Sequence, residues 1–307
     1  MKNPSITSQQ SKLLDAAEAI RLDPDKIEAA FMARQLVQAT LPHKNPGDIP
    51  AWSRKNGNLK LVIRSGWDSD RDKPIGYPYG TIPRLLLFWI TTEASRTKNP
   101  RLELGNNLAA FMRQLGLDPS RRGKGSDAWR LRDQMQRLFK ATISFHQKRE
   151  ENGRKGEAWL DMKVAPEGVL WWNERQPEQP TLWGSWIELS KQFFTAITAA
   201  PVPVDMRALK ALKRSPLALD LYAWTTYTAY QTQKSGHSRS VSWELLHQQL
   251  GAEYRDIKNF GKFARLSLRK VQTVYPELGL EFEKGGVTVL PCSPAVTFKA
   301  KRQKSVD

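Results

Sequence analysis

A run of basic residues near the end of the chain has the residue types and spacing to contact a polyanion. Between Arg255 and Lys270 only Asp256 carries negative charge. Lysine and arginine bind phosphates, arginine also pairs bidentately with guanine, and asparagine pairs with adenine. Arg265, Arg269 and Asn259 are therefore the best candidates for contacts to base edges. The residues predicted to contact DNA in this segment are Arg255, Lys258, Asn259, Lys262, Arg265, Arg269 and Lys270.

A second group of basic residues lies earlier in the chain, where more acidic residues stand between them. Asp133 interrupts a predicted helix over Asp127–Lys140, and Glu150 and Glu151 lie at the tip of a predicted hairpin. A basic helix face of this kind is often only solvated surface, so both interpretations stay open. The residues predicted to support DNA binding here are Arg121, Arg122, Lys124, Arg130, Arg132 and Arg137, with Lys148, Arg149, Arg154 and Lys155 at the hairpin tip.

Catalytic chemistry is the weaker interpretation of this sequence. A nicking enzyme would need a close pair of histidines to hold a metal ion beside a tyrosine nucleophile. Tyr227 and Tyr230 share a predicted helix face, but no histidine cluster accompanies them in the sequence, and we find no paired-carboxylate motif. We therefore expect no enzymatic activity, no metal and no cofactor. The histidines lie far apart, at His43, His146, His237 and His247.

One segment resembles part of a phosphate-binding loop, but it lacks two required residues. Gly123-Lys124 matches the end of the motif, whereas Asp118 stands where the first glycine belongs and Gly125 replaces the Ser or Thr after the lysine. The segment is better interpreted as a flexible loop that faces phosphates of DNA than as a nucleotide-triphosphate site.

The composition points to a polyanionic partner in a reducing compartment. The 307 residues carry a net charge of +17 and a single cysteine, Cys292. Such a charge favours nucleic acid or an anionic membrane surface as the partner. The N-terminus has no signal-peptide pattern, and the longest apolar run, near Leu85–Ile90, is too short to span a bilayer. We therefore expect a cytoplasmic protein that binds nucleic acid and no membrane.

The spacing of apolar residues predicts the elements that position these side chains. In the segment Ile257–Tyr275, one helix face should be buried, and Gly261 should let the helix approach a neighbouring wall. We also expect Trp89, Trp129 and Trp224 to pack in the core. The predicted buried stripe of the basic helix is Phe260, Phe263, Ala264, Leu268, Val271 and Val274.

The chain repeats one plan twice. Thr91-Thr92 matches Thr225-Thr226, and Leu115-Gly116 matches Leu250-Gly251 at nearly the same separation. Each copy contains a long apolar helix, a short strand, a short helix, a longer basic helix and a hairpin, which is the order of a winged helix. The hairpins are expected around Asn152-Gly153 and over Glu281–Leu290. In such a module the last helix enters the major groove of DNA.

The predicted fold class is α+β, with two tandem winged-helix domains related by duplication. We place a helical N-terminal extension and connector at residues 1–57, with helices over Gln10–Leu22 and Pro24–Leu41. The first winged-helix domain covers 58–200 and the second covers 201–298. A basic tail covers 299–307, and a proline-broken linker covers Arg175–Thr181.

The chain resembles the RepA-type initiators of plasmid replication. The resemblance rests on the duplicated plan over about 81–290, and on the segments PYGTIPRLLLFWITTEA, LGNNLAAFMRQLGLD, LDLYAWTTYTA and SWELLHQQLGAEY. It implies binding to directly repeated origin sequences, called iterons, opening of adjacent AT-rich DNA, and recruitment of the host initiator and replicative helicase. Carried onto this chain, Arg255–Lys270 becomes the base-reading helix and Arg121–Arg137 supplies supporting contacts.

The resemblance also implies homodimers that repress their own promoter, monomers that load on iterons, plasmid copy control and a bacterial location with the nucleoid or plasmid. Two alternatives remain open. One is a transcriptional repressor that binds an operator without melting DNA, and the other is a nicking-type replication enzyme.

Overall fold

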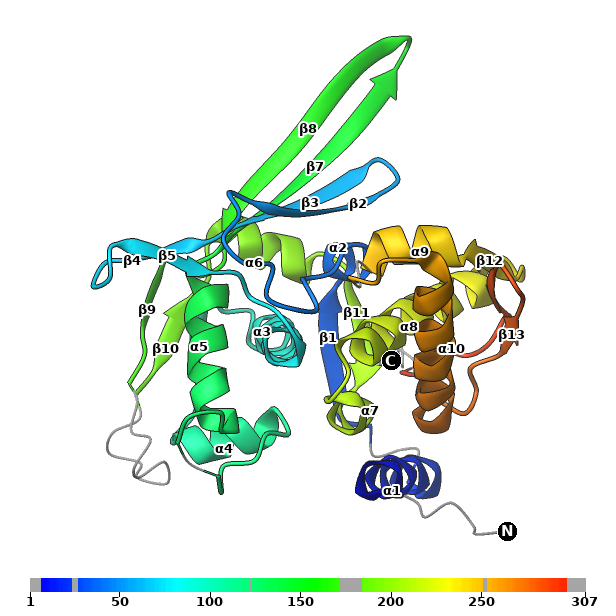
Figure 1. The fold of residues 1–307 in the computed structure, drawn as a ribbon, viewed down its shortest axis with the longest axis horizontal. Helices are drawn as coiled ribbons and strands as arrows, with labels where there is room; N and C mark the ends of the chain where they lie inside the picture. The colour runs from blue at the N-terminus through cyan, green and yellow to red at the C-terminus, as the bar shows by residue number, and fades with distance from the viewer. Residues whose placement is uncertain (1–6, 24–26, 122, 172–183, 251–252, 297–307) are drawn as a thin grey trace, which may run out of the picture.

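The computed structural model describes residues 7–23, 27–121, 123–171, 184–250 and 253–296. Helices and small antiparallel sheets alternate along the chain, so the protein has an α+β fold, as predicted. Figure 1 shows a body from which one long hairpin projects. The buried side chains of both halves belong to one continuous hydrophobic core. The expected linker at Arg175–Thr181, the expected tail at 299–307, and Gly251 lie outside the described residues.

The second half of the chain carries the basic helix singled out from the sequence. In this half β12, β14 and β13 form a three-stranded antiparallel sheet with β14 in the middle. The hairpin predicted over Glu281–Leu290 is therefore confirmed. The elements of this half are β11 (Pro201–Asp205), α7 (Met206–Leu212), α8 (Pro216–Ser235), β12 (Arg239–Ser242), α9 (Trp243–Leu250), α10 (Ile257–Val274), β13 (Leu280–Phe282) and β14 (Gly286–Val289).

The first half runs through a similar order of elements but is longer. Its small sheet contains β6, β10 and β9, with β10 in the middle. The elements of this half are α3 (Thr81–Thr97), β6 (Arg101–Glu103), α4 (Leu108–Gln114), α5 (Asp127–Phe139), β7 (Thr142–Glu151), β8 (Arg154–Lys163), β9 (Glu167–Val169), β10 (Trp186–Glu188) and α6 (Lys191–Thr198).

The two small sheets share one strand order. When strands are counted along the chain within each sheet, the order is first, third, second in both β6-β10-β9 and β12-β14-β13. The hairpin predicted around Asn152-Gly153 is present as β7–β8. The expectation that it closes the small sheet of the first half is wrong. It pairs with β3 in the separate sheet β2-β3-β7-β8, and β9–β10 is the pair that matches β13–β14.

The N-terminal residues join both halves of the molecule. β1 pairs with β11, whereas β2 and β3 extend the sheet of the long hairpin. The elements before α3 are α1 (Ser8–Leu22), β1 (Ala29–Ala33), α2 (Arg34–Gln38), β2 (Trp52–Asn56), β3 (Leu59–Arg64), β4 (Gly66–Asp68) and β5 (Lys73–Gly76). The predicted helix over Gln10–Leu22 is confirmed by α1, which the Thr7 side chain caps.

The predicted helix over Pro24–Leu41 is wrong. Residues 29–33 form β1, which pairs antiparallel with β11 from Ala29 opposite Asp205 to Ala33 opposite Pro201. The amide of Phe31 donates to the Thr92 hydroxyl at 2.8 Å, which ties β1 to α3. Among the described residues of this range, only the five of α2 are helical. Pairing with a strand in the second half of the chain overrides the local helical pattern, because burial between α3 and β11 decides the backbone state.

The long apolar helices α3 and α8 run through the core. Thr91 and Thr225, which mark the repeat in the sequence, are both fully buried. Trp89 and Trp224 are also buried, as predicted. The prediction for Trp129 is wrong, because its side chain is 40% exposed on the first turn of α5, where the helix faces solvent.

Candidate nucleic-acid interface

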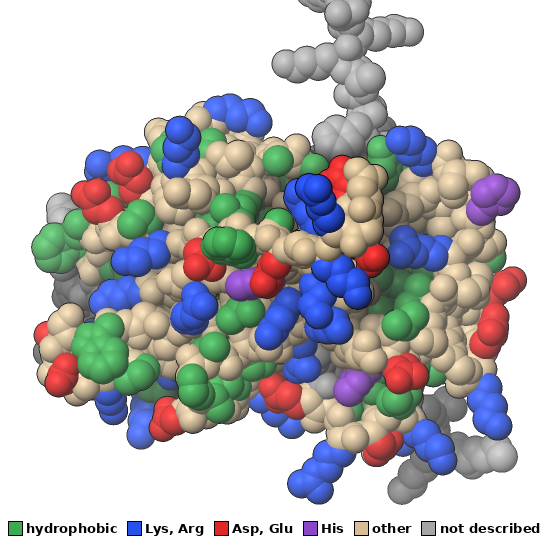
Figure 2. Space-filling model, turned by 90° about the horizontal axis from the view of Figure 1, so that it is seen from above, with side chains coloured by type: hydrophobic (Ala, Val, Ile, Leu, Met, Phe, Trp, Pro, Cys, Tyr) green, Lys and Arg blue, Asp and Glu red, His purple; other side chains and the backbone are tan. Residues whose placement is uncertain are grey.

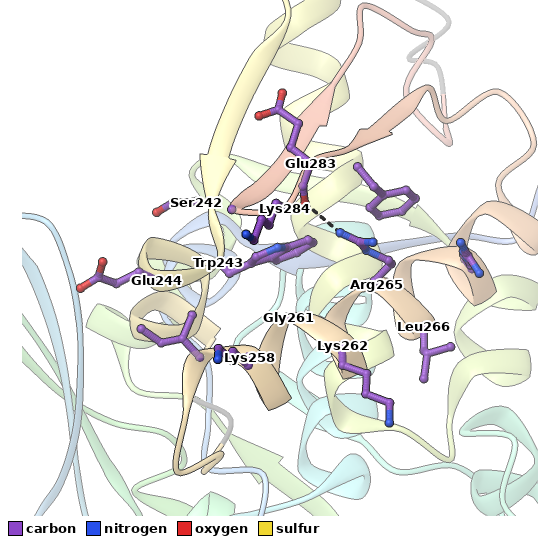
Figure 3. Close-up of a pocket in the computed structure, with 14 residues that line it drawn as sticks. Ser242, Trp243, Glu244, Lys258, Gly261, Lys262, Arg265, Leu266, Glu283 and Lys284 are labelled. Carbon is purple, nitrogen blue, oxygen red and sulfur yellow. Dashed lines mark hydrogen bonds between the residues drawn. The ribbon is translucent and has the colours of Figure 1, made fainter.

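A groove of about 830 Å³ lies between α10, the start of α9 and the β13–β14 turn. Figure 3 shows side chains from all three elements around it. Five basic residues line this groove, namely Lys258, Lys262, Arg265, Arg269 and Lys284, against two acidic ones, Glu244 and Glu283. We call it the α10 groove. The excess of basic residues suits a polyanionic chain better than a small apolar ligand.

The local sequence explains why α10 presents a basic face here. Asp256 caps the helix by accepting the Asn259 amide at 2.7 Å, and this hydrogen bond lowers the pKa of Asp256. The buried stripe, including Phe260, Ala264 and Leu268, packs on α8. Because helical residues three or four apart share a face, the lysines and arginines between these positions point outward.

Gly261 allows α10 to approach α9 closely, as predicted. A Cβ atom at this position would lie 3.1 Å from Cδ1 of the buried Trp243 ring. Any larger side chain would have to push that ring aside. The close approach sets the wall of the α10 groove, because Trp243 is the first residue of α9.

Arg265 does not project freely from the exposed face on which the sequence places it. It is half-buried, and its Nη2 donates to the Glu283 carbonyl oxygen at 2.8 Å. Its guanidinium carbon lies 5.9 Å from the Trp243 ring centroid and 5.4 Å from that of Phe282. Figure 3 shows Arg265 pointing toward the β13–β14 turn, whereas Lys262 points away from it. Arg265 therefore connects α10 to the hairpin.

Two other expectations for α10 need correction. Phe263 is predicted in the buried stripe, but it is 43% exposed and stacks on Tyr254, with ring centroids 5.2 Å apart and planes at 24°. Its helical position falls at the edge of the stripe, beyond the reach of α8. The Asn259 side-chain amide donates to the Asp256 carboxylate at 2.7 Å, so it is part of the helix cap.

The remaining predicted residues of this segment are exposed. Lys258, Lys262 and Arg269 line the α10 groove, whereas Arg255 and Lys270 do not, and Lys270 lines a separate pocket beside α1 and α7. The sequence analysis missed Lys284 and the Trp243 wall. Lys284 directly precedes the Gly285-Gly286 turn of the predicted hairpin, and a basic residue at a hairpin tip was the signal that could have identified it.

The first-half helix α5 offers fewer outward charges than predicted. Ser126 caps it by accepting the Trp129 amide. Arg137 is only 16% exposed, contacts Asp133 at 2.9 Å and lies over the Tyr79 ring at 5.5 Å. Arg137 therefore faces the loop before α3 more than solvent, and its contact with DNA stays a prediction.

The other predicted residues around α5 lie at the surface. Arg130 is 55% exposed but paired with Asp127 one turn earlier. The described loop and helix residues Arg121, Lys124 and Arg132 are exposed. Arg122 lies outside the described residues. None of these side chains lines the α10 groove, so the structure does not bring the two predicted basic sets together.

The tip of the β7–β8 hairpin exposes Lys148, Arg149, Arg154 and Lys155. Their cross-strand neighbours reduce the charge, since Lys148 faces Glu157, Lys155 faces Glu150 and Arg154 faces Glu151. Only Arg149 faces an uncharged residue, Gly156. Seen from the side toward which the hairpin projects, basic side chains are scattered over the surface with acidic ones between them (Figure 2).

The described part of the chain contains no group of three or more His, Cys, Asp or Glu residues arranged to hold a metal ion. His43 contacts Asp220, and His146 contacts Glu157. Within the same residues, no helix has the length and apolar character needed to span a membrane.

Comparisons with known proteins give one family. Residues 77–245, more than half of the chain, match the family described as "Plasmid encoded RepA protein". The match ends before α10 begins. No curated protein matches the chain. Two crystal structures of domains 2 and 3 of RctB, one of them a selenomethionine derivative, are similar at 14% and 13% identity, with TM-scores of 0.48 and 0.43. Each match covers 83% of this chain, and 95% and 94% of those chains.

Proposed function

Because this chain belongs to the family of plasmid encoded RepA proteins, we propose that it initiates plasmid replication by binding repeated sequences, or iterons, in duplex DNA at the plasmid origin. The observation that carries the DNA-binding part of this proposal is the α10 groove. All five of its basic residues lie outside the residues matched to the family, so its role is argued from geometry and charge. We place the main DNA contact at α10 and the β13–β14 turn.

We propose that each half works as a winged helix. The strand order shared by the two small sheets and the position of α5 and α10 before the last two strands support this assignment. In the second half, α10 enters the major groove and the β13–β14 turn lies against the neighbouring phosphates. The first half contacts the DNA backbone more weakly, because α5 loses the charge of Arg137 to an internal ion pair.

Affinity and selectivity come from different side chains of α10. Lys258, Lys262 and Lys284 bind phosphates and release counterions, which makes binding steeply dependent on salt. Arg269 is the exposed arginine of the α10 groove, and it takes the base-reading role with guanine. Arg265 holds the hairpin in position over the helix and keeps its other N–H groups for the DNA.

The long hairpin β7–β8 adds a contact to the DNA at a distance from the α10 groove. Figure 1 shows that this hairpin extends well beyond the body. Its tip carries four basic residues, of which Arg149 is the least compensated. We assign it a phosphate contact that does not depend on sequence.

The remaining steps of initiation follow from the proposed role. They are opening of AT-rich DNA, recruitment of the host initiator and helicase, homodimers at the promoter, copy control, and a location with the plasmid in the bacterial cytoplasm. We further propose that the chain acts without cleaving DNA. Incubation with supercoiled origin DNA and Mg²⁺ tests that point, since a covalent adduct between protein and DNA would contradict it.

The central experiment is footprinting of the purified protein on the DNA that flanks its own gene. We expect several protected repeats of one sequence, and permanganate-reactive thymines in an adjacent AT-rich segment. Protection of a single operator without reactive thymines would identify a repressor instead. Equal affinity for this DNA and for random duplexes of the same length would refute the proposed function.

A further inference from the structure

Three large apolar side chains of α10 are exposed, namely Ile257 at the first position of the helix, at 42%, and Phe263 and Leu266 farther along it. Phe263 is 43% exposed and Leu266 is 45% exposed. Leu266 lines the α10 groove together with Lys262 and Arg269. Figure 3 shows Leu266 and Lys262 pointing away from the β13–β14 turn. These apolar groups therefore lie among the charges that we assign to DNA contacts.

The exposed position of Leu266 adds nothing to the packing of the core. The buried face of α10 is formed by residues such as Phe260, Ala264 and Leu268, which lie on the opposite side of the helix from Leu266. Leu266 is four residues from both Lys262 and Lys270, and residues at that spacing are neighbours on one helix face. A single exposed leucine needs no explanation, but Leu266 and the exposed Phe263 one turn away form an apolar patch among lysines, and such a patch marks a contact made outside the protein.

Phe263 is held at the surface by a specific contact. Its ring stacks on Tyr254, and Tyr254 also meets the buried Phe260 edge to face, with centroids 5.9 Å apart. The Phe263 ring is thus anchored beside Leu266, one helical turn away. A fixed apolar pair at this place can select a ligand by shape, because its side chains lose little freedom on binding.

The surrounding charge identifies the kind of ligand. Lys258, Lys262, Arg269 and Lys270 are exposed around the pair, so the partner carries phosphates. On the edges of the base pairs, the major groove offers one apolar group, the C5-methyl of thymine, and apolar side chains recognise it there. An apolar protein partner would leave these four charges without phosphates to neutralise.

We propose that Leu266, with Phe263 beside it, contacts thymine methyl groups in the major groove of the bound repeat. This inference rests on the proposed function, and it adds that the recognised sequence contains thymine next to the guanine read by Arg269. It assigns selectivity to two apolar residues that no charge pattern in the sequence would single out.

The test replaces thymine by deoxyuridine in the footprinted repeat, one position at a time, which removes the methyl group and keeps base pairing. We expect about fourfold weaker binding for each contacted methyl group, the effect of leaving one buried methylene-sized group out of the interface. The same replacement in a random duplex should change binding little, because phosphate contacts do not sense the methyl group.

Variants then assign the effect to the side chain. Leu266→Ala should bind thymine and uracil repeats equally, whereas Leu266→Met keeps an apolar contact and should retain the preference for thymine. Leu160→Ala is the matched control, because Leu160 is 41% exposed on the β7–β8 hairpin, outside the α10 groove. It should leave the preference unchanged.

The outcomes separate this inference from the proposed function. If the wild-type protein prefers its repeat over random DNA but binds thymine and uracil versions equally, the methyl contact is refuted and the proposed function stands. If Leu266→Ala keeps the wild-type preference for thymine, the assignment to Leu266 is wrong. If the wild-type protein shows no preference for the repeat at all, the proposed function fails first.

Discussion

Arg84 of α3 and Asp220 of α8 form a buried, bidentate ion pair that joins the two halves of the molecule. Nε of Arg84 donates to Oδ1 at 2.7 Å and Nη2 donates to Oδ2 at 2.8 Å. The remaining donors of Arg84 reach the carbonyl oxygens of Leu41, Pro42 and Gly80. His43 Nε2 lies 2.7 Å from the same carboxylate. The cluster therefore holds together α3, α8 and the segment Leu41–His43, which follows α2.

The buried charges of this cluster are paired and hydrogen-bonded, which is the condition under which a buried charge is tolerated. Burial alone would raise the pKa of Asp220, but the charge of Arg84 and the hydrogen bonds from His43 and Arg84 lower it. Burial, aided by the charge of Arg84, lowers the pKa of His43. The folded protein thus holds an ionised aspartate beside a neutral histidine.

Loss of Arg84 should destabilise the fold strongly. Arg84→Ala leaves the Asp220 carboxylate buried with only His43 as a side-chain partner, and we expect a loss of about 3–5 kcal/mol in the free energy of unfolding. Denaturant unfolding followed by circular dichroism measures it. Arg96→Ala, which removes an exposed pair with Glu93, is the control and should leave unfolding nearly unchanged. Equal effects of the two substitutions would contradict the structural role of the buried pair.

Stability should fall on mild acidification because of His43. Its pKa is lower in the folded protein than its ordinary value of 6.5, so below pH 6.5 the unfolded chain binds more protons. The free energy of unfolding should drop as the pH falls from about 7 to about 5, by up to about 1.4 kcal/mol per pH unit. Asp220, whose pKa is lowered, contributes only below its ordinary value of 3.8, outside this window.

A substitution isolates this histidine. His43→Gln keeps a side-chain amide that can donate to Asp220 but does not titrate, so the pH dependence over the same range should become flatter. Urea midpoints measured across the range provide the comparison. An unchanged slope in His43→Gln would assign the acid sensitivity to other groups.

Lys262→Ala should weaken binding to all duplexes alike. Lys262 is exposed in the α10 groove and points away from the hairpin, a geometry suited to a phosphate contact (Figure 3). Removing one such contact should reduce the slope of log affinity against log salt by about 0.9. Lys234→Ala, an exposed lysine at the end of α8, is the control and should keep the wild-type slope. A selective loss on the origin repeat would instead give Lys262 a base-reading role.

Arg265→Ala should reduce origin selectivity by releasing the β13–β14 hairpin. The substitution removes the hydrogen bond to the Glu283 carbonyl, which is worth about 1.5 kcal/mol for a charged donor at a half-exposed site. Hydrogen exchange of the β13 and β14 amides should accelerate, and Arg265→Lys should not restore it, because an ammonium group lacks the planar fork. Lost selectivity with unchanged exchange would mean that Arg265 reads a base directly.

Arg149→Ala should weaken DNA binding more than Arg154→Ala. The two residues lie on opposite strands of the same hairpin tip, and Arg154 faces Glu151 whereas Arg149 faces Gly156. An acid opposite Arg154 already neutralises part of its charge, so less phosphate attraction is lost with it. Electrophoretic mobility shifts on random duplexes measure both. Indistinguishable losses would show that cross-strand pairing does not tune this contact.

The sequence alone determined the features that depend on neighbours along the chain. The amphipathic stripe of α10, the cap at Asp256 and the hairpin at Asn152-Gly153 follow from residues within a few positions of one another. The net charge is likewise a property of the residues themselves, and the segments that carry the resemblance to RepA-type initiators lie in the sequence. These properties are local or compositional, so sequence patterns carry them.

Only the tertiary structure decided which of these residues face outward and which strands pair. β1, near the N-terminus, pairs with β11 in the second half of the chain, and this pairing makes a strand of residues that were expected to be helical. Arg137 and Arg265 lie on helices predicted to be basic, yet each contacts a partner on another element. Phe263 belongs to the stripe that the helical period predicts as buried, yet its side chain is 43% exposed. Burial and pairing between distant segments are set by packing, and the helical period leaves them undetermined.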